Sequence, residues 1–353
     1  MMKWVLLGIA LVIPAFSGAL IATIFALTLA GVPLGIAAAT NGKKSDTKRA
    51  IDIRMAFVLG AVCVTTLLGF FGNVSWVFDV LSSFRMQLAA VSLSLAIYFA
   101  VSALRIMTVV CVCALAANMW FVTPLFVGTP PAGALSKIKV MLINVNVSTG
   151  NPEKVENQVV YEDPDLLVLQ EVSDAWMVAL KGLEKRYPYH IFKPRDDSFG
   201  IAMFSKTPFE AKIVTLAQID VPTILAKWHS RLGQIDVIAT HPLPPTSAKY
   251  ASARTAALKA IPSVVPKIGS AIVVGDLNTA PFGGKFAELI KSTGLLDSSR
   301  GWGFQPTWAL PAGLITVPID HLLHTRDLRV LDRRIGSSVG SDHCPLIVEL
   351  APL

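Results

Sequence analysis

Residues 4–40 contain no charged side chain, and this run constrains the fold more than any other feature of the chain. It is far longer than the apolar core of a signal peptide, and it exceeds the ~20 residues that one membrane-spanning helix needs. Pro14, Gly31 and Pro33 interrupt it, so it is either one long span or a hairpin of two short ones. The N-terminal part of the chain is therefore expected to lie in a membrane.

Two more apolar stretches follow. Residues 55–78 predict a further span, with residues 79–85 as the turn on its far side. Residues 86–127 are apolar apart from Arg105, and they are long enough for two spans joined by a tight turn at that arginine. If residues 86–127 were instead one tilted span with Arg105 buried, the C-terminal part of the chain would lie on the opposite side of the membrane. This alternative is disfavoured because burying an arginine within the bilayer costs free energy. We predict an all-α transmembrane region over residues 1–127, with about four spans.

Residues 41–54 are rich in lysine and arginine, and we predict that they form a basic loop. The positive-inside rule places such a loop in the cytoplasm. Counting the spans onward from it places the C-terminal part of this multi-pass chain on the extracytoplasmic side. The alternative, that these segments are buried helices of a large soluble protein, is disfavoured because they have no polar stripe.

The C-terminal part differs in composition from the apolar part. Residues 1–136 carry a net charge of +5, whereas residues 137–353 carry +2, so the second part is not a basic domain and its charge gives little support for a nucleic-acid-binding face. Its one cysteine, Cys344, excludes a disulfide within it. Residues 128–136 contain Pro130 and Pro131 and predict a stiff linker between the two parts.

A short apolar run, residues 271–274, ends in Gly275-Asp276-Leu277-Asn278. Valine and isoleucine in such a run predict a buried strand, and the glycine allows a turn where the strand stops. A rigid strand end can hold a carboxylate and an amide still and leave them open to a substrate. The alternative is an Asx turn, in which Asp276 only caps the next segment.

Polar residues recur where other apolar runs stop. Strands are expected at residues 138–145, 165–170, 199–204 and 234–240, with helices through residue 186 and over residues 247–267. The polar residues beside these runs are Asn144, Asn146, Glu171, His241, Asp320, His321, Asp342 and His343. Short strands with few helices between them predict a mixed or antiparallel α/β (α+β) sandwich.

Acids and amides at several strand ends suit a hard divalent cation such as Mg²⁺, with Mn²⁺ as the alternative. Zinc fits poorly, because the histidines are scattered and Cys344 has no thiol neighbour. An aspartate that accepts an imidazole N–H would support either an imidazolium or a general base. Each residue alone has an ordinary explanation as a helix-terminal acid, a turn residue or a loop histidine, so their joint occurrence carries the argument.

These motifs, in this order, resemble the endonuclease/exonuclease/phosphatase superfamily of Mg²⁺-dependent phosphoesterases, which includes deoxyribonuclease I, abasic-site endonucleases, inositol-phosphate 5-phosphatases and sphingomyelinases. The resemblance covers roughly residues 137–350 and implies a four-layer sandwich for a catalytic domain at 137–353. The matching motifs are Asn144, Gln170-Glu171, Gly200-Ile201-Ala202, Thr240-His241, Gly275-Asp276-Leu277-Asn278, Ile319-Asp320-His321 and Ser341-Asp342-His343.

The resemblance also implies roles for single residues. It makes Glu171 a metal ligand, with Asn144 helping to hold the site and Asp342 near the metal. The catalytic residues that it implies have separate tasks. His241 contacts the scissile phosphate, Asn278 binds phosphate, and Asp276 orients or deprotonates the attacking water. His343, polarised by Asp320, stabilises the phosphorane or acts as the base.

The segment Thr240-His241-Pro242-Leu243-Pro244-Pro245 departs from the usual continuation of this motif. It resembles a bacterial branch in which a similar domain follows several membrane spans, and Arg254 and Pro306-Thr307-Trp308 match that branch as well. Such a chain is expected in a bacterial-type inner membrane. The loops that bind DNA in the nucleases have no clear match.

The first hypothesis is a membrane-anchored, Mg²⁺-dependent phosphodiesterase or phosphatase. The linker is short, so the domain cannot rise far from the bilayer, and we expect a lipid-linked phosphate or pyrophosphate as substrate. The alternatives are an anchored endonuclease or exonuclease, and a catalytically silent binding module. The lipid bilayer and a phosphate ester are the expected partners; the oligomeric state is left open.

Overall fold

The computed structural model describes residues 45–128, 133–134, 136–310, 313 and 315–353. They divide into two compact units. The first contains the described residues up to Thr123, with the short segments Pro245–Ala251 and Phe282–Gly284, and the second contains the remainder. The apolar run at residues 4–40 lies outside the described residues, as do residues 129–132 and 135 of the predicted linker.

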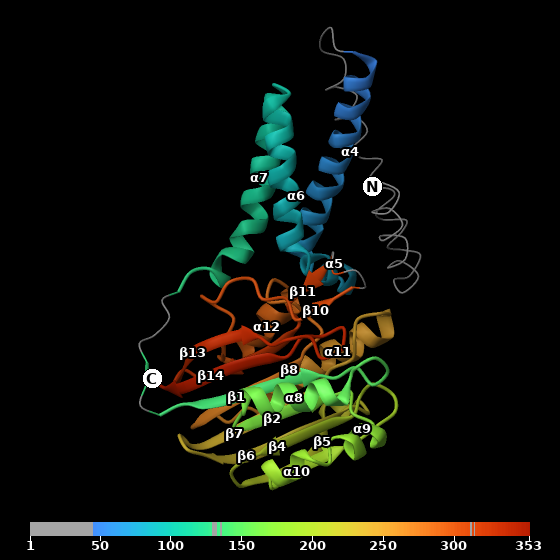
Figure 1. The fold of residues 1–353 in the computed structure, drawn as a ribbon. Coiled ribbons are helices and arrows are strands. Elements are labelled where there is room, and N and C mark those ends of the chain that lie inside the picture. The colour runs from blue at the N-terminus through green and yellow to red at the C-terminus, as the bar shows by residue number, and fades with distance from the viewer. Residues whose placement is uncertain (1–44, 129–132, 135, 311–312, 314) are drawn as a thin grey trace. The chain divides into compact units, whose positions relative to one another are not determined.

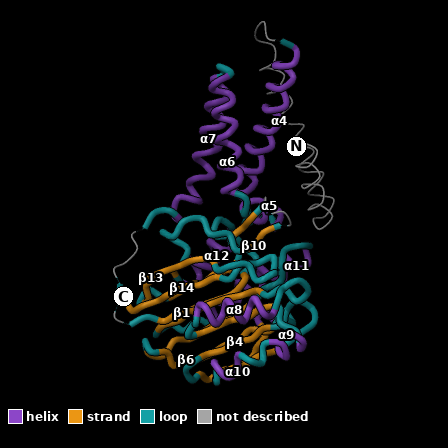
Figure 2. Tube along the Cα trace, viewed as in Figure 1, coloured by secondary structure: helices purple, strands orange, loops and turns teal. Residues whose placement is uncertain are grey.

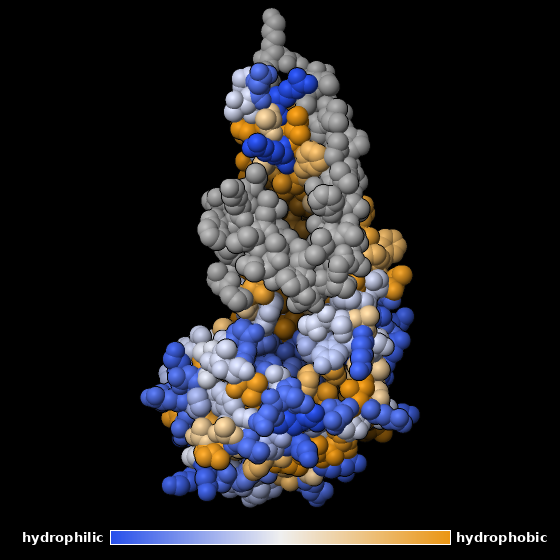
Figure 3. All heavy atoms as spheres, turned by 90° about the vertical axis from the view of Figure 1, so that its right-hand side faces the viewer, coloured by the Kyte–Doolittle hydropathy of each residue, from blue (hydrophilic) through white to orange (hydrophobic). Residues whose placement is uncertain are grey.

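The first unit is helical (Figures 1 and 2). Its elements are α4 (Asp46–Leu68), η2 (Gly69–Phe71), α5 (Trp76–Ser82), α6 (Arg85–Val101) and α7 (Arg105–Val122). Apolar residues of α4, α6 and α7 form a shared core that includes Leu59, Phe99 and Cys111. Figure 3 shows hydrophilic residues gathered at the end of the unit where α4 begins, and apolar residues beyond them.

The prediction of a basic loop at residues 41–54 is wrong from residue 46 onward. Ser45 caps α4 by accepting a hydrogen bond from the backbone N–H of Lys48, and Asp46 stands in the first turn, where an acid complements the helix dipole. The basic residues Lys48 and Arg49 are exposed on the first turns of this helix. The charged segment therefore extends the apolar helix instead of preceding it.

Within the described residues, two helices are long and apolar enough to cross a membrane, Asp46–Phe71 and Arg105–Leu125. The pair α5 and α6 passes the same test together, although it is bent by 59°, so the number rises to three if this pair is one span. The predicted tight turn at Arg105 is confirmed, since α6 ends at Val101 and α7 begins at Arg105.

The predicted far-side turn at residues 79–85 is shorter than expected. Asp79 belongs to α5 and Arg85 begins α6, and both side chains are buried. The Arg85 guanidinium donates to the Thr66 carbonyl oxygen at 3.1 Å and to Asn118 Oδ1 at 3.2 Å. Arg85, which the sequence pattern assigned to a turn, is thus buried in the core of the helical unit, where it donates hydrogen bonds to residues of α4 and α7.

The second unit is a two-sheet sandwich (Figure 1). One sheet has the order β13-β14-β1-β2-β4-β3 and the other the order β5-β6-β7-β8-β12-β9. The strands of the first sheet are β1 (Ile138–Asn144), β2 (Leu166–Gln170), β3 (Tyr189–Lys193), β4 (Ile201–Ser205), β13 (Leu328–Ile335) and β14 (Leu346–Pro352). Those of the second are β5 (Phe209–Thr215), β6 (Pro222–Ser230), β7 (Gly233–Thr240), β8 (Ser270–Asp276), β9 (Leu296–Asp297) and β12 (Asp320–His324).

Both faces of the central strands are buried, which explains why their sequences are apolar without alternation. Val140 and Leu142 of β1 face the core between the sheets, whereas Met141 and Ile143 pack beneath the outer helices. The helices outside the first sheet are α8 (Pro152–Glu162), α9 (Asp174–Ala179) and α10 (Leu183–Arg186), and those outside the second are α11 (Ala248–Ala260) and α12 (Gly284–Thr293). The result is the predicted α/β sandwich with two mixed sheets.

The predicted central strands are confirmed within two residues, but the predicted helices are too long. The expected helix through residue 186 is two short helices, α9 and α10, and the one over 247–267 ends at Ala260, just before Pro262. Proline in the following 3₁₀ turn cannot donate the backbone hydrogen bond that would continue an α-helix.

At Gly275, the backbone of β8 lies very close to the neighbouring strand β7 and to a side chain of the first sheet. A Cβ atom at this position would lie 1.9 Å from the Thr240 carbonyl oxygen and 2.8 Å from Nε2 of Gln170. Gln170 crosses from the first sheet to the second, where its Nε2 donates to Thr240 O and its Oε1 accepts from Asp276 N, both at 2.9 Å. Glycine at 275 is what allows this close approach.

Gly275→Ala is therefore expected to destabilise the protein by about 3 kcal/mol or more, because the clash is with backbone that cannot move aside. Gly133→Ala is the matched control, since a Cβ there has no neighbour within 4 Å. Thermal unfolding of the full-length protein in detergent measures both. Equal unfolding midpoints for the two variants would contradict the close approach.

Candidate active site

The polar residues at the strand ends converge at one edge of the sandwich. Asn144 and Gln170 end the parallel neighbours β1 and β2 in register with each other. In the second sheet, Asp276 at the end of β8 is in register with Asp320 at the start of β12. The Gln170 hydrogen bonds join these two edges, so residues from both sheets surround one place.

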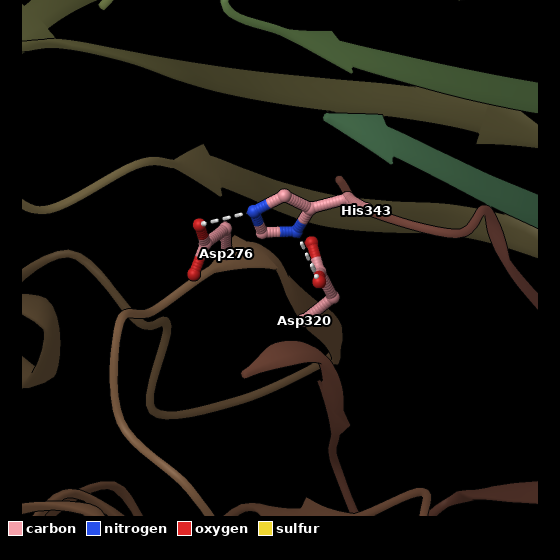
Figure 4. A group of neighbouring side chains, drawn as sticks. All are labelled: Asp276, Asp320 and His343. Carbon is pink, nitrogen blue, oxygen red and sulfur yellow. Dashed lines mark hydrogen bonds and ion pairs between the residues drawn. The ribbon is translucent and has the colours of Figure 1, made fainter. Parts of the chain in front are cut away.

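Three buried ionisable side chains form the centre (Figure 4). His343 Nδ1 lies 2.8 Å from Asp320 Oδ2, and its Nε2 lies 3.7 Å from Asp276 Oδ2. Asp276 Oδ2 is also 3.4 Å from His241 Nε2. The imidazole of His343 therefore stands between two carboxylates, and we call Asp276, Asp320 and His343 the trio.

The electrostatics of the trio follow from this geometry. Burial alone lowers the pKa of His343, but the charge and hydrogen bond of Asp320, with Asp276 and Asp342, outweigh burial and raise this pKa to about 10. Burial raises the pKa of Asp276, and His241 and His343 together overcome that effect and lower it. Near neutral pH His343 is thus an imidazolium and Asp276 a carboxylate.

Asparagine side chains link the trio to a second group of oxygen atoms. Asn144 Nδ2 donates to Glu171 Oε1 at 2.9 Å and lies 3.5 Å from Asp276 Oδ2. Asn144 Oδ1 accepts from Asn146 N at 3.1 Å, and Asn146 Nδ2 donates to Asp342 Oδ1 at 2.7 Å. Glu171, Asn144, Asn146 and Asp342 form one hydrogen-bonded row, which we call the oxygen row.

Two groups of side chains could hold a divalent cation. The ligand atoms of the trio lie within 4.8 Å of one another. However, Nδ1 of His343 is already engaged by Asp320 Oδ2 at 2.8 Å, so only its Nε2 could face a cation. The oxygen row supplies the carboxylates of Glu171 and Asp342, and carboxylate oxygens are ligands that Mg²⁺ and Mn²⁺ prefer.

Three site residues have left-handed backbones, and for one of them, Glu171, this conformation is strained. Asn146, Glu171 and Asn278 adopt φ angles of 51°, 61° and 52°, in the left-handed region that side chains other than those of Asn and Asp rarely adopt. Each lies just past the end of β1, β2 or β8, where the chain must turn sharply to present a side chain to the site. Such strain is common at functional sites and is held in place by the surrounding structure.

Asn278 is fixed on three sides. Its backbone N–H donates to Asp276 Oδ1 at 2.8 Å, its Nδ2 donates to the Pro242 carbonyl oxygen at 2.9 Å, and its own carbonyl accepts from the Arg254 guanidinium at 2.6 Å. One hydrogen of the side-chain amide remains for a substrate oxygen. The buried Arg254, singled out in the sequence only as a motif match, is thus a support for this loop.

The structure brings together the eight residues to which the sequence assigned a role, although these roles stay predictions. They are Asn144, Glu171, His241, Asp276, Asn278, Asp320, Asp342 and His343. His321 behaves differently from its neighbour Asp320: its Nε2 bonds to the Thr279 carbonyl oxygen at 2.8 Å and its ring packs on Phe286, so it supports the site from behind. Asn146 was treated as an ordinary turn residue, and its spacing from Asn144 was the one signal that could have assigned it.

A model of the Endonuclease/Exonuclease/phosphatase family matches residues 141–343, which is more than half of the chain and includes the trio and the oxygen row. The chain belongs to this family. No curated protein shows significant similarity to the chain.

Solved structures show the same fold at low identity. An endonuclease/exonuclease/phosphatase from Beutenbergia cavernae is 19% identical, with a TM-score of 0.50 over 61% of this chain and 72% of that one. TDP2 from D. rerio, in complex with a single-strand DNA product, is 16% identical, with a TM-score of 0.52 over 61% and 99%. A 3′ phosphatase from Neisseria, bound to a product DNA hairpin, is 19% identical, with a TM-score of 0.50 over 61% and 99%.

Replacement of Asp320 by asparagine is expected to lower the pKa of His343 from about 10 toward its ordinary value of 6.5, because a major opposing charge is removed. A folded-state pKa raised in this way stabilises the protein fully below pH 6.5, and this stabilisation is lost as the pH rises through 10. NMR titration of the histidine ring signals in metal-free protein measures the shift.

Asp327→Asn is the matched control, because Asp327 bonds to Ser270 at the end of β8 and β12 opposite to Asp276 and Asp320. A His343 titration that is unchanged in Asp320→Asn would show that the trio is not coupled as its geometry indicates.

Proposed function

We propose that this protein is a membrane-anchored, divalent-cation-dependent hydrolase of phosphate esters. Members of the family to which it belongs are phosphoesterases, and the observation that carries the proposal here is the trio beside the oxygen row. A cation on the oxygen row would neutralise charge on a phosphoryl group and bring it next to the trio. Glu171 and Asp342 would hold that cation, with Asn144 and Asn146 orienting the two carboxylates.

In the proposed reaction, Asp276 orients the attacking water and takes up its proton through Oδ2. The water oxygen bonds to phosphorus as the bond from phosphorus to the ester oxygen breaks, and that oxygen leaves as an alcohol after it takes a proton from solvent. A carboxylate with a lowered pKa is a weak base, so its main contribution is to hold the water in line for attack. His343, charged and backed by Asp320 at 2.8 Å, donates a hydrogen bond to the phosphoryl oxygen on which negative charge develops. This assignment prefers His343 as a stabilising cation over His343 as the base.

His241 and Asn278 complete the proposed phosphate site. Burial lowers the pKa of His241, but its hydrogen bond with Asp276 outweighs this effect and raises it, which favours the charged form against an anionic substrate. Its Nδ1 is buried and has no hydrogen-bond partner. Asn278 offers its remaining amide hydrogen from a loop that Pro242 and Arg254 hold.

We infer further that the substrate is a lipid-linked phosphate or pyrophosphate. The apolar helices Asp46–Phe71 and Arg105–Leu125 support a membrane anchor, and few residues separate Leu125 from the first strand at Ile138. A domain tethered this closely meets lipid head groups at high effective concentration. On this proposal the anchor is multi-pass in a bacterial-type inner membrane, with a linker over residues 128–136, and the catalytic domain at 137–353 is extracytoplasmic.

The test compares a polyprenyl pyrophosphate and plasmid DNA as substrates of the full-length protein in liposomes with Mg²⁺. We expect phosphate release from the lipid, its loss in EDTA, and a decrease of about 10² in turnover for Asp276→Asn, because a group that handles the proton of the water is removed. Glu171→Gln should instead raise the Mg²⁺ concentration needed for half-maximal activity.

Rapid DNA cleavage without turnover of the lipid would reject the lipid substrate and favour the nuclease. An Asp276→Asn variant with the wild-type rate on the substrate that is cleaved would refute the assigned site.

A further inference from the structure

Trp308 lies on a segment that is fixed from two sides. It belongs to β10 (Trp308–Ala309), which pairs with β11 (Thr316–Val317) and forms an isolated bridge to His343. Ala309 N donates to the Asp342 carbonyl oxygen at 3.1 Å, and the Thr307 carbonyl oxygen accepts from Cys344 N at 2.7 Å. The backbone of Trp308 is therefore bound to the loop that carries Asp342 and His343.

Thr307, the residue before Trp308, is hydrogen-bonded to the backbone of Asp320 in the trio. Thr307 is buried, and its hydroxyl oxygen accepts the backbone N–H groups of Ile319 at 3.3 Å and Asp320 at 3.1 Å. The position of Trp308 is thus fixed, through Thr307, by the start of β12, which carries Asp320.

The indole N–H of Trp308 donates to Asp342 Oδ2 at 2.8 Å. The other oxygen of this carboxylate, Oδ1, accepts from Asn146 Nδ2 at 2.7 Å. Asp342 is exposed, and an exposed aspartate with no partner would sample several rotamers. Here neutral donors from different elements hold both oxygen atoms, and the Ser341 hydroxyl adds a longer contact of 3.5 Å to Oδ1, so the remaining lone pairs are directed.

Neutral donors suit a carboxylate that must bind a cation. A lysine or arginine at either position would fix Asp342 equally well but would also cancel its charge and repel the metal ion. The indole and the amide orient the carboxylate without adding charge. Groups that orient metal ligands in this way affect metal affinity although they never touch the metal.

We propose that Trp308 is a positioning residue that orients the Asp342 carboxylate for the divalent cation through its indole N–H. This inference rests on the proposed function, in which Asp342 is a metal ligand. It concerns a residue that the sequence singled out only as part of a motif. Its effect is expected on the affinity for the cation more than on turnover at saturating cation.

The test is Mn²⁺ binding by the full-length protein in detergent, measured from the electron paramagnetic resonance signal of free Mn²⁺. Trp308→Phe keeps an aromatic ring but lacks the N–H, and we expect it to raise the Kd for Mn²⁺ about tenfold. Trp308→benzothienylalanine, in which sulfur replaces the N–H in a ring of the same shape, should give the same increase without a packing defect. Turnover at saturating Mn²⁺ should change by less than about threefold in both.

Trp302→Phe is the matched control, because Trp302 lies in the segment just before β10. Its hydrogen bond to Gln305 is made by the backbone carbonyl oxygen, so this bond does not depend on the side chain that is replaced. Its Kd for Mn²⁺ should equal that of the wild type. Wild-type affinity for Mn²⁺ in both Trp308 variants, or an equal loss of affinity in Trp302→Phe, would overturn the role of Trp308 and leave the proposed function standing. A wild-type protein that binds no Mn²⁺ would overturn the metal-dependent function and this inference with it.

Discussion

The side-chain amide of Gln170 is the interaction on which the site depends. It is fully buried and joins the end of β2 in one sheet to Thr240 and Asp276 in the other. A buried amide that lost one of these partners would leave a polar group unsatisfied, which costs about 1–3 kcal/mol. This link fixes the relative register of the sheets at the edge where their polar strand ends meet. Asn144 and Glu171 are thereby brought to Asp276, although more than 100 residues separate them in sequence.

The charges at this edge are separated into two groups with different chemistry. In the trio, an imidazolium lies between two carboxylates, so one positive charge faces two negative charges in a buried setting. In the oxygen row, amides separate Glu171 from Asp342, and no hydrogen bond of the row cancels either negative charge. On the proposed function, a divalent cation bound to the oxygen row would balance these two carboxylate charges.

Much of the catalytic unit could be predicted because its central strands are buried on both faces. Continuous runs of valine, isoleucine and leucine, each ended by a polar residue, located β1, β2, β7 and β8 within two residues. The fold class followed from the short strands and the order of the motifs. The edge strands were missed, as in β5, because their burial alternates weakly and their sequences contain charged residues such as Glu210 and Lys212.

The features that could not be predicted from the sequence depend on local caps or on contacts between distant elements. The start of α4 was missed because its first turns are charged, and only the Ser45 cap marks them as helical. Arg85 was assigned to a turn because an arginine between apolar stretches normally faces water, whereas here Thr66 and Asn118 accept its hydrogen bonds inside the helix core. Trp308 had no assignable role, since its partner Asp342 is 34 residues away.

The separation of the trio from the oxygen row is the central claim, and the position of a bound cation tests it most directly. Crystals grown with Mn²⁺ and measured near the manganese absorption edge would locate the ion by its anomalous scattering. We predict a peak at about 2.2 Å from a carboxylate oxygen of Glu171, on the oxygen row, with His343 outside the coordination shell. A peak between Asp276 and Asp320 with His343 as a ligand would contradict the account.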